Sequence, residues 1–554
     1  MAPGKFNFAS AADTFDQTGR FAELSAPLDA LLRAGGDERL ALVGRSGLNI
    51  YGCKPAPRPE ANCFSSSTAS SISGAAYLRA RAAQEKLVEQ ASVDGLPESF
   101  ASQIEQARHT LRSCLGLEES GAEIIFAPSG TDAQLLAVLL AQLIVGTPVT
   151  SVVVGADQTG SGTAYTAIAR HFGTRTARGR SVWKGEAVAP GAREIEKIDV
   201  PFSDESGVFR PADEMDRCVW QAVGDAIAGG SKVILLAMNA SKFGWRAPSD
   251  ECLARISANW PGEVQIVLDA CQMRIGRARL RRHLANDHIV LITGSKFFSG
   301  PPFSGGLLVP KRLSHRLAQA QRLPRGVFDY AERSDLPAAW PALSDGLAQA
   351  PNFGQWLRWE AALEEMRAYF ALALSYRRKV LAGLAQALPR AIGRSGRLLS
   401  LPMPQGHCGE SALDEEFASP TIFPFVIRST HGFLEADAMS EIYRDLNRDI
   451  SAELRCDATP DRSIFAARIC HVGQPVKINL AGSATAALRI AIGSRNLCDA
   501  WQPGPNAAER AVNRIMDEVS SVLGKLELIL KNREHAPSAM HRDPHRTLEN
   551  SNGR

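Results

Sequence analysis

Six short apolar runs recur between residues 95 and 330 of this 554-residue chain, and helical patterns separate them. None of the runs alternates apolar with polar residues, which is typical of strands that are buried on both faces. Strands of this kind form a parallel sheet covered by helices, and ligands bind such sheets at the carboxyl ends of the strands. The sequence therefore predicts an α/β large domain of the doubly wound type. The runs are EIIFA (123–127), SVVVGA (151–156), KVILLAM (232–238), VQIVLDA (264–270), HIVLITG (288–294) and GGLLVP (305–310).

The rest of the chain divides into segments with other patterns. Strand signals at 421–428 and 487–493 flank a helical pattern at 435–447, which indicates a smaller α+β domain. The final residues are basic with few apolar side chains, as in disordered tails. The expected organisation is an N-terminal arm and helix (1–94), the large domain (95–330), linking helices (331–394) that include one long helical stretch (352–388), a small C-terminal domain (395–503), a terminal helix (504–530) and a disordered tail (531–554).

A loop rich in proline, serine and cysteine lies at 51–73, within the predicted arm. Its aromatic, basic and hydroxyl side chains suit contact with a substrate, so one hypothesis is that it folds over a site in the large domain. The interpretation that we prefer at this point is a packing arm.

Composition restricts the class of function. With 62 basic and 59 acidic residues the chain carries a formal charge of +3, which provides no general basic field for nucleic acid or membranes. Its ten cysteines form no C-x-x-C pair, so no metal site is indicated, and no apolar run is long enough to cross a bilayer. The first residues do not resemble a signal peptide. We expect a cytoplasmic enzyme without nucleic-acid or membrane partners.

One candidate anion site lies at the end of the first apolar run. The sequence passes from a strand through Pro-Ser-Gly-Thr directly into a helical pattern. Free backbone N–H groups at a helix start, together with hydroxyls, bind phosphate well. Ser129, Gly130 and Thr131 are therefore candidate phosphate ligands, although the same residues also suit a simple helix cap.

Two further strand ends carry ionisable residues. Asp269 closes one buried run, where a carboxylate is costly unless it is paired, for example with a protonated pyridine nitrogen. Lys296 follows the next run among small residues, as a lysine that forms a Schiff base would. The 27 residues between them allow one crossover and the next strand, so both side chains should reach the same sheet edge. Gln272, Thr293 and Ser295 lie beside them.

These segments resemble the class V aminotransferase and cysteine desulfurase superfamily of fold-type I enzymes that depend on pyridoxal 5'-phosphate (PLP). LDACQ followed by TGSK and a Gly/Pro loop is similar to its D-A-x-Q and S-x-H-K-x-x-G-P patterns, and SGTDA, NASKFGWRAPS and LRIAIGSRN are similar to three other segments in the same order. The resemblance implies that Lys296 forms the internal aldimine and Asp269 pairs with the pyridinium. It further implies that Gln272 contacts the phenolate oxygen, that Arg489 binds the substrate carboxylate, and that phosphate is held by Ser129, Gly130, Thr131 and Thr293. The hydroxyl of Ser295, beside Lys296, could add a phosphate contact.

Three positions depart from the family pattern. Ser295 replaces the usual histidine before the lysine, and Ser241 stands where an asparagine approaches the ring oxygen. Gln158 and Thr159 occupy the region of the histidine that normally stacks on the ring. Contacts with the cofactor ring are therefore expected to be unusual.

The resemblance implies a PLP enzyme that acts through an external aldimine on a small amino-acid-like substrate, and we favour a class V aminotransferase. A first alternative is a cysteine desulfurase-like or other C–S/β-lyase, because AARICHVGQPV is similar to a desulfurase loop and would make Cys470 catalytic, provided its thiol is exposed with a lowered pKa. A second is a non-catalytic regulator or scaffold with the same fold. The family further implies a homodimer with active sites at the interface.

Overall fold

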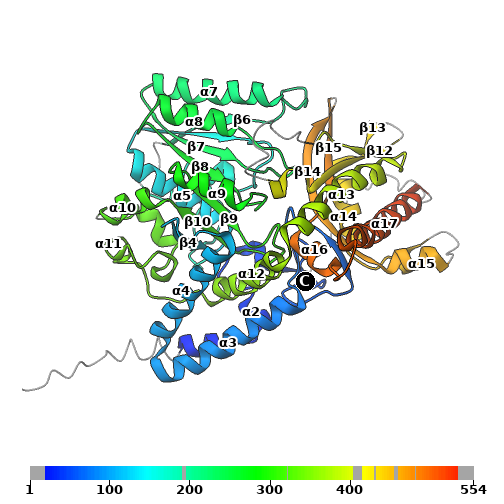
Figure 1. The fold of residues 1–554 in the computed structure, drawn as a ribbon, viewed down its shortest axis with the longest axis horizontal. Coiled ribbons are helices and arrows are strands. Elements are labelled where there is room, and N and C mark those ends of the chain that lie inside the picture. The colour runs from blue at the N-terminus through cyan, green and yellow to red at the C-terminus, as the bar shows by residue number, and fades with distance from the viewer. Residues whose placement is uncertain are drawn as a thin grey trace, which may run out of the picture.

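The large domain is built on a seven-stranded sheet (Figure 1). The computed structural model describes residues 19–189, 195–320, 322–403, 415–429, 432–454, 460–480 and 482–534. The strands, in their order across the sheet, are β4 (Glu123–Ala127), β10 (Gly305–Val309), β9 (Ile289–Thr293), β8 (Val264–Asp269), β7 (Lys232–Met238), β5 (Val149–Val154) and β6 (Ile195–Val200). Only β10 runs antiparallel to its neighbours within this described sheet.

All six apolar runs lie in strands of this sheet, which confirms the predicted fold class of a mostly parallel sheet covered by helices. The strand that the sequence did not reveal is β6, at one edge. Its residues IEKIDV include Glu196, Lys197 and Asp199, which are exposed or only partly buried. An edge strand with one solvated side does not produce a continuous apolar run.

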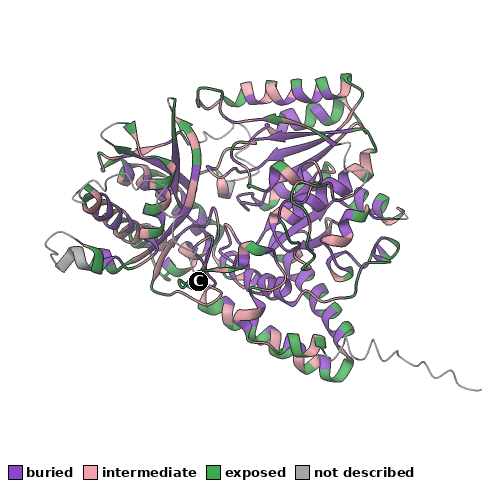
Figure 2. Cartoon of the chain, turned by 180° about the vertical axis from the view of Figure 1, so that it is seen from behind, coloured by how far each residue is buried: buried purple, intermediate pink, exposed green. Residues whose placement is uncertain are grey.

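Both faces of the sheet are buried in separate cores, as Figure 2 shows for the strands. Successive residues of β4 alternate between them: Ile124 and Phe126 pack in one core, and Ile125 and Ala127 in the other. The first core also holds buried residues of α7 (Ala212–Ala228), α8 (Asp250–Asn259) and α9 (Arg277–Ala285), whereas the second holds α5 (Gly130–Val145) and α10 (Lys311–Ala318). This two-sided packing keeps the strand ends at one shared edge.

The second sheet joins the two ends of the chain. Its strands follow the order β11 (Leu398–Ser400), β12 (Ile422–Ser429), β15 (Ser483–Ala491), β14 (Ile469–Leu480) and β3 (Ala61–Phe64), and β13 (Gly432–Phe433) pairs with β12. β3 pairs in parallel with β14, so that Ala61 lies opposite Ile469. The N-terminal segment is thus a strand of the smaller domain as well as an arm.

Two expectations about the helices were wrong. The continuous stretch at 352–388 is two helices, α12 (Phe353–Ala371) and α13 (Leu374–Gly393), because Leu372 and Ala373 adopt extended backbone angles. The terminal helix α17 runs over Ala507–Glu534, so residues 531–534 are helical, not part of a disordered tail, and residues 535–554 lie outside the described ranges.

The remaining elements pack around these two sheets. α12 contacts α3 (Gly74–Asp94) and α4 (Leu96–Leu115), while α17 contacts α13, α14 (Ala436–Leu446), α15 (Pro460–Ala467) and α16 (Ser494–Ala500). Among the described residues, no helix combines the length and the apolar character needed to cross a membrane. The short elements are α2 (Leu28–Leu31), α6 (Thr163–Thr166), α11 (Pro341–Ser344), β1 (Leu42–Val43), β2 (Leu48–Asn49), and single 3-10 turns at Glu38–Leu40, Arg325–Asp329, Arg333–Asp335, Glu415–Phe417 and Ser451–Glu453.

Candidate active site

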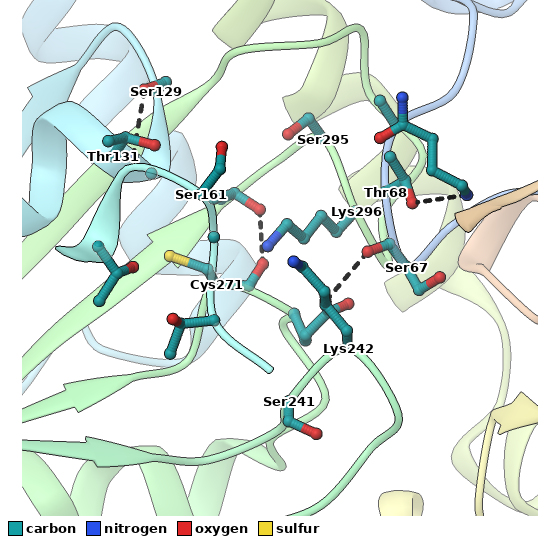
Figure 3. A pocket seen from close by; sticks show the side chains of 18 of the residues that line it. Ser67, Thr68, Ser129, Thr131, Ser161, Ser241, Lys242, Cys271, Ser295 and Lys296 are labelled. Carbon is teal, nitrogen blue, oxygen red and sulfur yellow. Dashed lines mark hydrogen bonds between the residues drawn. The ribbon is translucent and has the colours of Figure 1, made fainter. Parts of the chain in front are cut away.

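A pocket of about 290 Å³ opens at the carboxyl ends of the parallel strands, between the large domain and the second sheet (Figure 3). Every site residue predicted from the sequence lines it except Cys470. These residues are Ser129, Gly130, Thr131, Gln158, Thr159, Ser241, Asp269, Gln272, Thr293, Ser295, Lys296 and Arg489.

Asp269 and Lys296 reach the pocket from adjacent strands. Asp269 is the last residue of β8, and Lys296 comes three residues after the end of β9, which pairs with β8 in parallel. The Asp269 carboxylate accepts a hydrogen bond from the Cys271 backbone N–H at 3.0 Å. Within the described residues, neither the carboxylate nor the Lys296 amine forms an ion pair. An acid and an amine are thus both available to a ligand in one pocket.

The start of α5 forms one wall of the pocket. Ser129 is the N-cap residue, and its hydroxyl oxygen accepts the backbone N–H groups of Thr131 and Asp132 at 3.2 Å each. Gly130 has no room for a side chain, because a Cβ atom would lie 3.0 Å from Cys271 Sγ and 3.2 Å from Thr293 Cγ2. The backbone therefore approaches the pocket closely at the predicted phosphate turn, as anion sites at helix starts require.

Arg39 also belongs to this wall, and sequence analysis missed it. Its guanidinium donates to Thr131 Oγ1 and to Ser129 Oγ, both at 3.2 Å. Asp37 holds the same guanidinium through a short ion pair, and the Phe303 ring packs against it at 4.6 Å. About 90 residues separate Arg39 from the phosphate turn, and no pattern in the arm distinguishes this arginine from a surface residue.

A buried acid lies below the phosphate turn. Asp132 has no exposed surface, and one of its carboxylate oxygens has no hydrogen-bond partner in the described structure. Burial, and then the charge of nearby Asp37, raise the pKa of Asp132 to about 7, although Ser129 and Arg39 act in the opposite direction. Its charge near neutral pH is therefore sensitive to what binds at the turn.

The opposite wall consists of Arg489 and the residues that hold it. Arg489 is on β15 and donates to Thr68 Oγ1 at 2.9 Å, to the Gln474 carbonyl at 2.6 Å and to the Lys242 carbonyl at 3.3 Å. Its Nε has no partner within the described residues. Burial lowers the pKa of Arg489 to about 10. All of these partners are neutral oxygens, so this cation has no countercharge from the described protein.

Lys242, in the loop after β7, is a second residue that sequence analysis did not identify. Its side chain enters the pocket and ends beside that of Lys296 (Figure 3). Burial, followed by the charges of Arg489 and Lys296, lowers the pKa of Lys242 to about 8. The segment NASKFGW was recognised as a strand end. A single lysine within it did not indicate a site residue, because its neighbours in the pocket are distant in the sequence.

The N-terminal loop contributes directly to the pocket. Tyr51, Ser67, Thr68 and Ala69 line it, so the segment at 51–73 is more than the packing arm that we preferred from the sequence. The Ser67 backbone carbonyl accepts a hydrogen bond from the amide of Gln272 at 3.1 Å.

The polar residues assigned to the cofactor ring are bonded to other protein groups. Ser241 donates to the side-chain oxygen of Gln158 at 2.5 Å, and Thr159 donates to the Ala156 carbonyl at 3.2 Å. The oxygen of the Gln272 amide accepts from Arg274 at 3.1 Å. Their roles toward a ligand stay predictions.

The structure corrects the prediction for Cys470. This residue lies in β14, opposite Asn62 of β3, and has no exposed surface. Burial raises the pKa of the Cys470 thiol to about 11. The segment that resembled a flexible desulfurase loop is a sheet strand, and its thiol is neither exposed nor readily ionised, so it does not supply a nucleophile to the pocket.

Comparisons with known proteins identify similar folds only among distant structures. No protein-family model matches the chain, and no curated protein matches it. The cysteine desulfurase CsdA from Escherichia coli is similar over 84% of this chain and 96% of its own, with 13% identity and a TM-score of 0.46. The TDC of Oryza sativa with PLP and tryptamine is similar over 95% and 100%, with 14% identity and a TM-score of 0.48. A third similar structure is the glutamate decarboxylase domain of a diaminobutyrate-pyruvate transaminase and L-2,4-diaminobutyrate decarboxylase from Vibrio parahaemolyticus. The similarity covers 95% of this chain and 97% of that domain, with 12% identity and a TM-score of 0.47.

Proposed function

We propose that this chain is an enzyme that carries pyridoxal 5'-phosphate on Lys296 and exchanges the amino group of a small amino-acid-like substrate. The observation that supports this most strongly is that the Lys296 amine and the Asp269 carboxylate, which form no ion pair within the described residues, lie at adjacent strand ends in one pocket. Both side chains are partly buried, and withdrawing an ionisable group from water costs free energy that a ligand engaging both groups would offset.

The residues of the pocket fit the three reactive parts of this cofactor. Its aldehyde matches the Lys296 amine, and its basic ring nitrogen matches the Asp269 carboxylate. Its phosphate matches the turn at Ser129–Thr131, where the helix start and the Arg39 guanidinium supply positive charge. When bound, the cofactor supplies a ring that withdraws electrons from the carbon bearing the substrate's amino group.

The side chains of this chain would provide positioning and proton transfer. Asp269, with one hydrogen bond from Cys271 N–H, would keep a proton on the ring nitrogen. Arg489 would hold the substrate carboxylate. The amine of Lys296, freed when the substrate binds, would take a proton from the substrate carbon that bears the amino group. It would return this proton to the cofactor carbon on the other side of the amino nitrogen. Transamination needs no further nucleophile. The desulfurase alternative depended on Cys470, which lies outside the pocket, so we do not retain it.

The test is an absorption titration of the purified chain with PLP. We expect a visible band that shifts when an amino acid is added. Sodium borohydride should bleach this band and attach the cofactor irreversibly to Lys296. Lys296→Ala should lose the band, whereas the matched control Lys477→Ala, at an exposed lysine on β14, should keep it.

Amino-group exchange is measured separately, as formation of a new amino acid from a 2-oxo acid in the presence of a donor amino acid. Loss of exchange in Lys296→Ala supports an aminotransferase. A protein that stays colourless with PLP, or a Lys296→Ala variant that keeps the band, refutes the proposal. A normal band without any exchange or breakdown of amino acids would favour the regulator or scaffold alternative.

A further inference from the structure

The pocket is lined by more cationic than acidic side chains. Four cationic side chains line it, namely Arg39, Lys242, Lys296 and Arg489. Asp269 is the one carboxylate among the described residues that line it. Unpaired cations in a partly buried site repel one another and are costly to desolvate, so the excess indicates an anionic ligand.

Two of these cations are accounted for by the proposed cofactor. Arg39 is paired with Asp37 and faces the phosphate turn, and Lys296 becomes the covalent attachment point. Lys242 and Arg489 remain. They come from different domains, the loop after β7 and strand β15, and both line the pocket, where the Arg489 guanidinium donates to the Lys242 backbone carbonyl at 3.3 Å.

Arg489 is arranged to bind one anion, and the Lys242 ammonium is available to bind a second. Thr68, Gln474 and the Lys242 carbonyl fix its guanidinium, while its Nε stays without a partner. The Lys242 amine forms no ion pair within the described residues, and both Arg489 and Lys296 act on it as like charges. A single carboxylate on Arg489 would leave the Lys242 ammonium unbalanced.

The surroundings of these two cations are polar and ready to accept a ligand. The Ser67 hydroxyl is buried, lines the pocket and has no hydrogen-bond partner in the described structure. Ser67 and Thr68 both come from the N-terminal loop, and the Thr68 hydroxyl accepts a hydrogen bond from Arg489. A free hydroxyl donor that lines the same pocket as two cations suits carboxylate oxygens.

We propose that the substrate is a dicarboxylic amino acid, or one with an equivalent second acidic group, and that Lys242 and Arg489 bind its two acidic groups. This inference rests on the proposed function for the fate of the amino group. The pair of cations itself does not depend on the cofactor, and this independence allows a separate test.

The test is calorimetric titration of the purified chain, with and without PLP, using succinate and glutarate against butyrate and pentanoate. We expect the dicarboxylates to bind at least about tenfold more tightly, since a charge-assisted hydrogen bond contributes about 1.4 kcal/mol or more, the equivalent of that factor. Lys242→Met should abolish the preference for dicarboxylates. The control Lys477→Met should preserve the preference, and Lys242→Arg should restore part of it.

The second arm compares L-aspartate and L-glutamate with L-asparagine and L-glutamine, using the shift of the cofactor band in the loaded protein. Equal affinity for the acids and their amides, or a preference that survives in Lys242→Met, overturns the inference and leaves the proposed function standing. If PLP does not bind but dicarboxylates bind in a Lys242-dependent manner, the proposed function fails and the two-cation site is supported.

Discussion

Replacement of Arg39 by glutamine should weaken the binding of PLP. Binding of pyridoxal, which lacks the phosphate, should be unaffected. The Arg39 guanidinium donates to Ser129 Oγ and Thr131 Oγ1 at the start of α5, where the phosphate is proposed to bind. Hydrogen bonds to a charged group contribute about 1.5–3 kcal/mol, and each 1.4 kcal/mol changes a dissociation constant tenfold. We therefore expect PLP affinity to fall roughly 10- to 100-fold. Asp37 then loses its partner and adds repulsion toward the phosphate, so the larger value is favoured.

The assay for Arg39→Gln is absorption titration with both compounds in parallel. Because Arg39 also packs on Phe303, thermal unfolding without cofactor should be recorded to separate lost binding from lost folding. Arg39→Lys keeps the charge but not the planar fork, and it should give an intermediate PLP affinity. If Arg39→Gln weakens PLP and pyridoxal by the same factor, or weakens neither, then this arginine does not bind the phosphate and the assignment of the turn is refuted.

Four further outcomes follow from the structure. Dicarboxylate affinity should fall as the pH rises through and above about 8, because the Lys242 ammonium deprotonates there. The charged groups that share its pocket are Arg489, Lys296 and Asp269. Calorimetry of Lys242→Met should show no such decline. Because the pKa of Asp132 is raised in the folded chain, its contribution to stability is present below about pH 4 and is lost as the pH rises through about 7; urea unfolding of Asp132→Asn should lack this loss. Gly305→Ala would place a Cβ atom against the Ser129 carbonyl and should destabilise the fold by about 1–3 kcal/mol and weaken PLP, whereas Gly393→Ala, with nothing near its Cβ, should do neither. Light scattering should give the mass of two chains, and a mass of one would contradict the expected homodimer.

The sequence predicted those parts of the site that follow directly from a strand. Asp269 and Lys296 each stand just after a continuous apolar run, so local pattern alone placed them at one sheet edge. The run GGLLVP was predicted as a strand as well, although its antiparallel direction came from pairing with β4 and β9, which no local pattern encodes.

The residues that sequence analysis missed or assigned wrongly depend on contacts between distant segments. Arg39 and Lys242 belong to the pocket because they contact segments that are distant in the chain. Arg39 contacts the turn at Ser129, and Lys242 contacts β15. Cys470 failed for the converse reason: a local resemblance to a loop ignored the pairing of β14 with β3, which buries the thiol. Pattern and spacing report what a segment can form alone, whereas these three outcomes depend on tertiary partners.

The parallel pairing of β3 with β14 also has a consequence for how the molecule is made. Thr68 leaves the ribosome 421 residues before Arg489, whose guanidinium it binds, and the strand that anchors its loop, β14, also comes long after it. The large sheet can form during synthesis, since all its strands precede residue 310, yet the pocket cannot close until β14 and β15 have emerged. A nascent chain would thus be unable to complete the pocket before β15 has been translated.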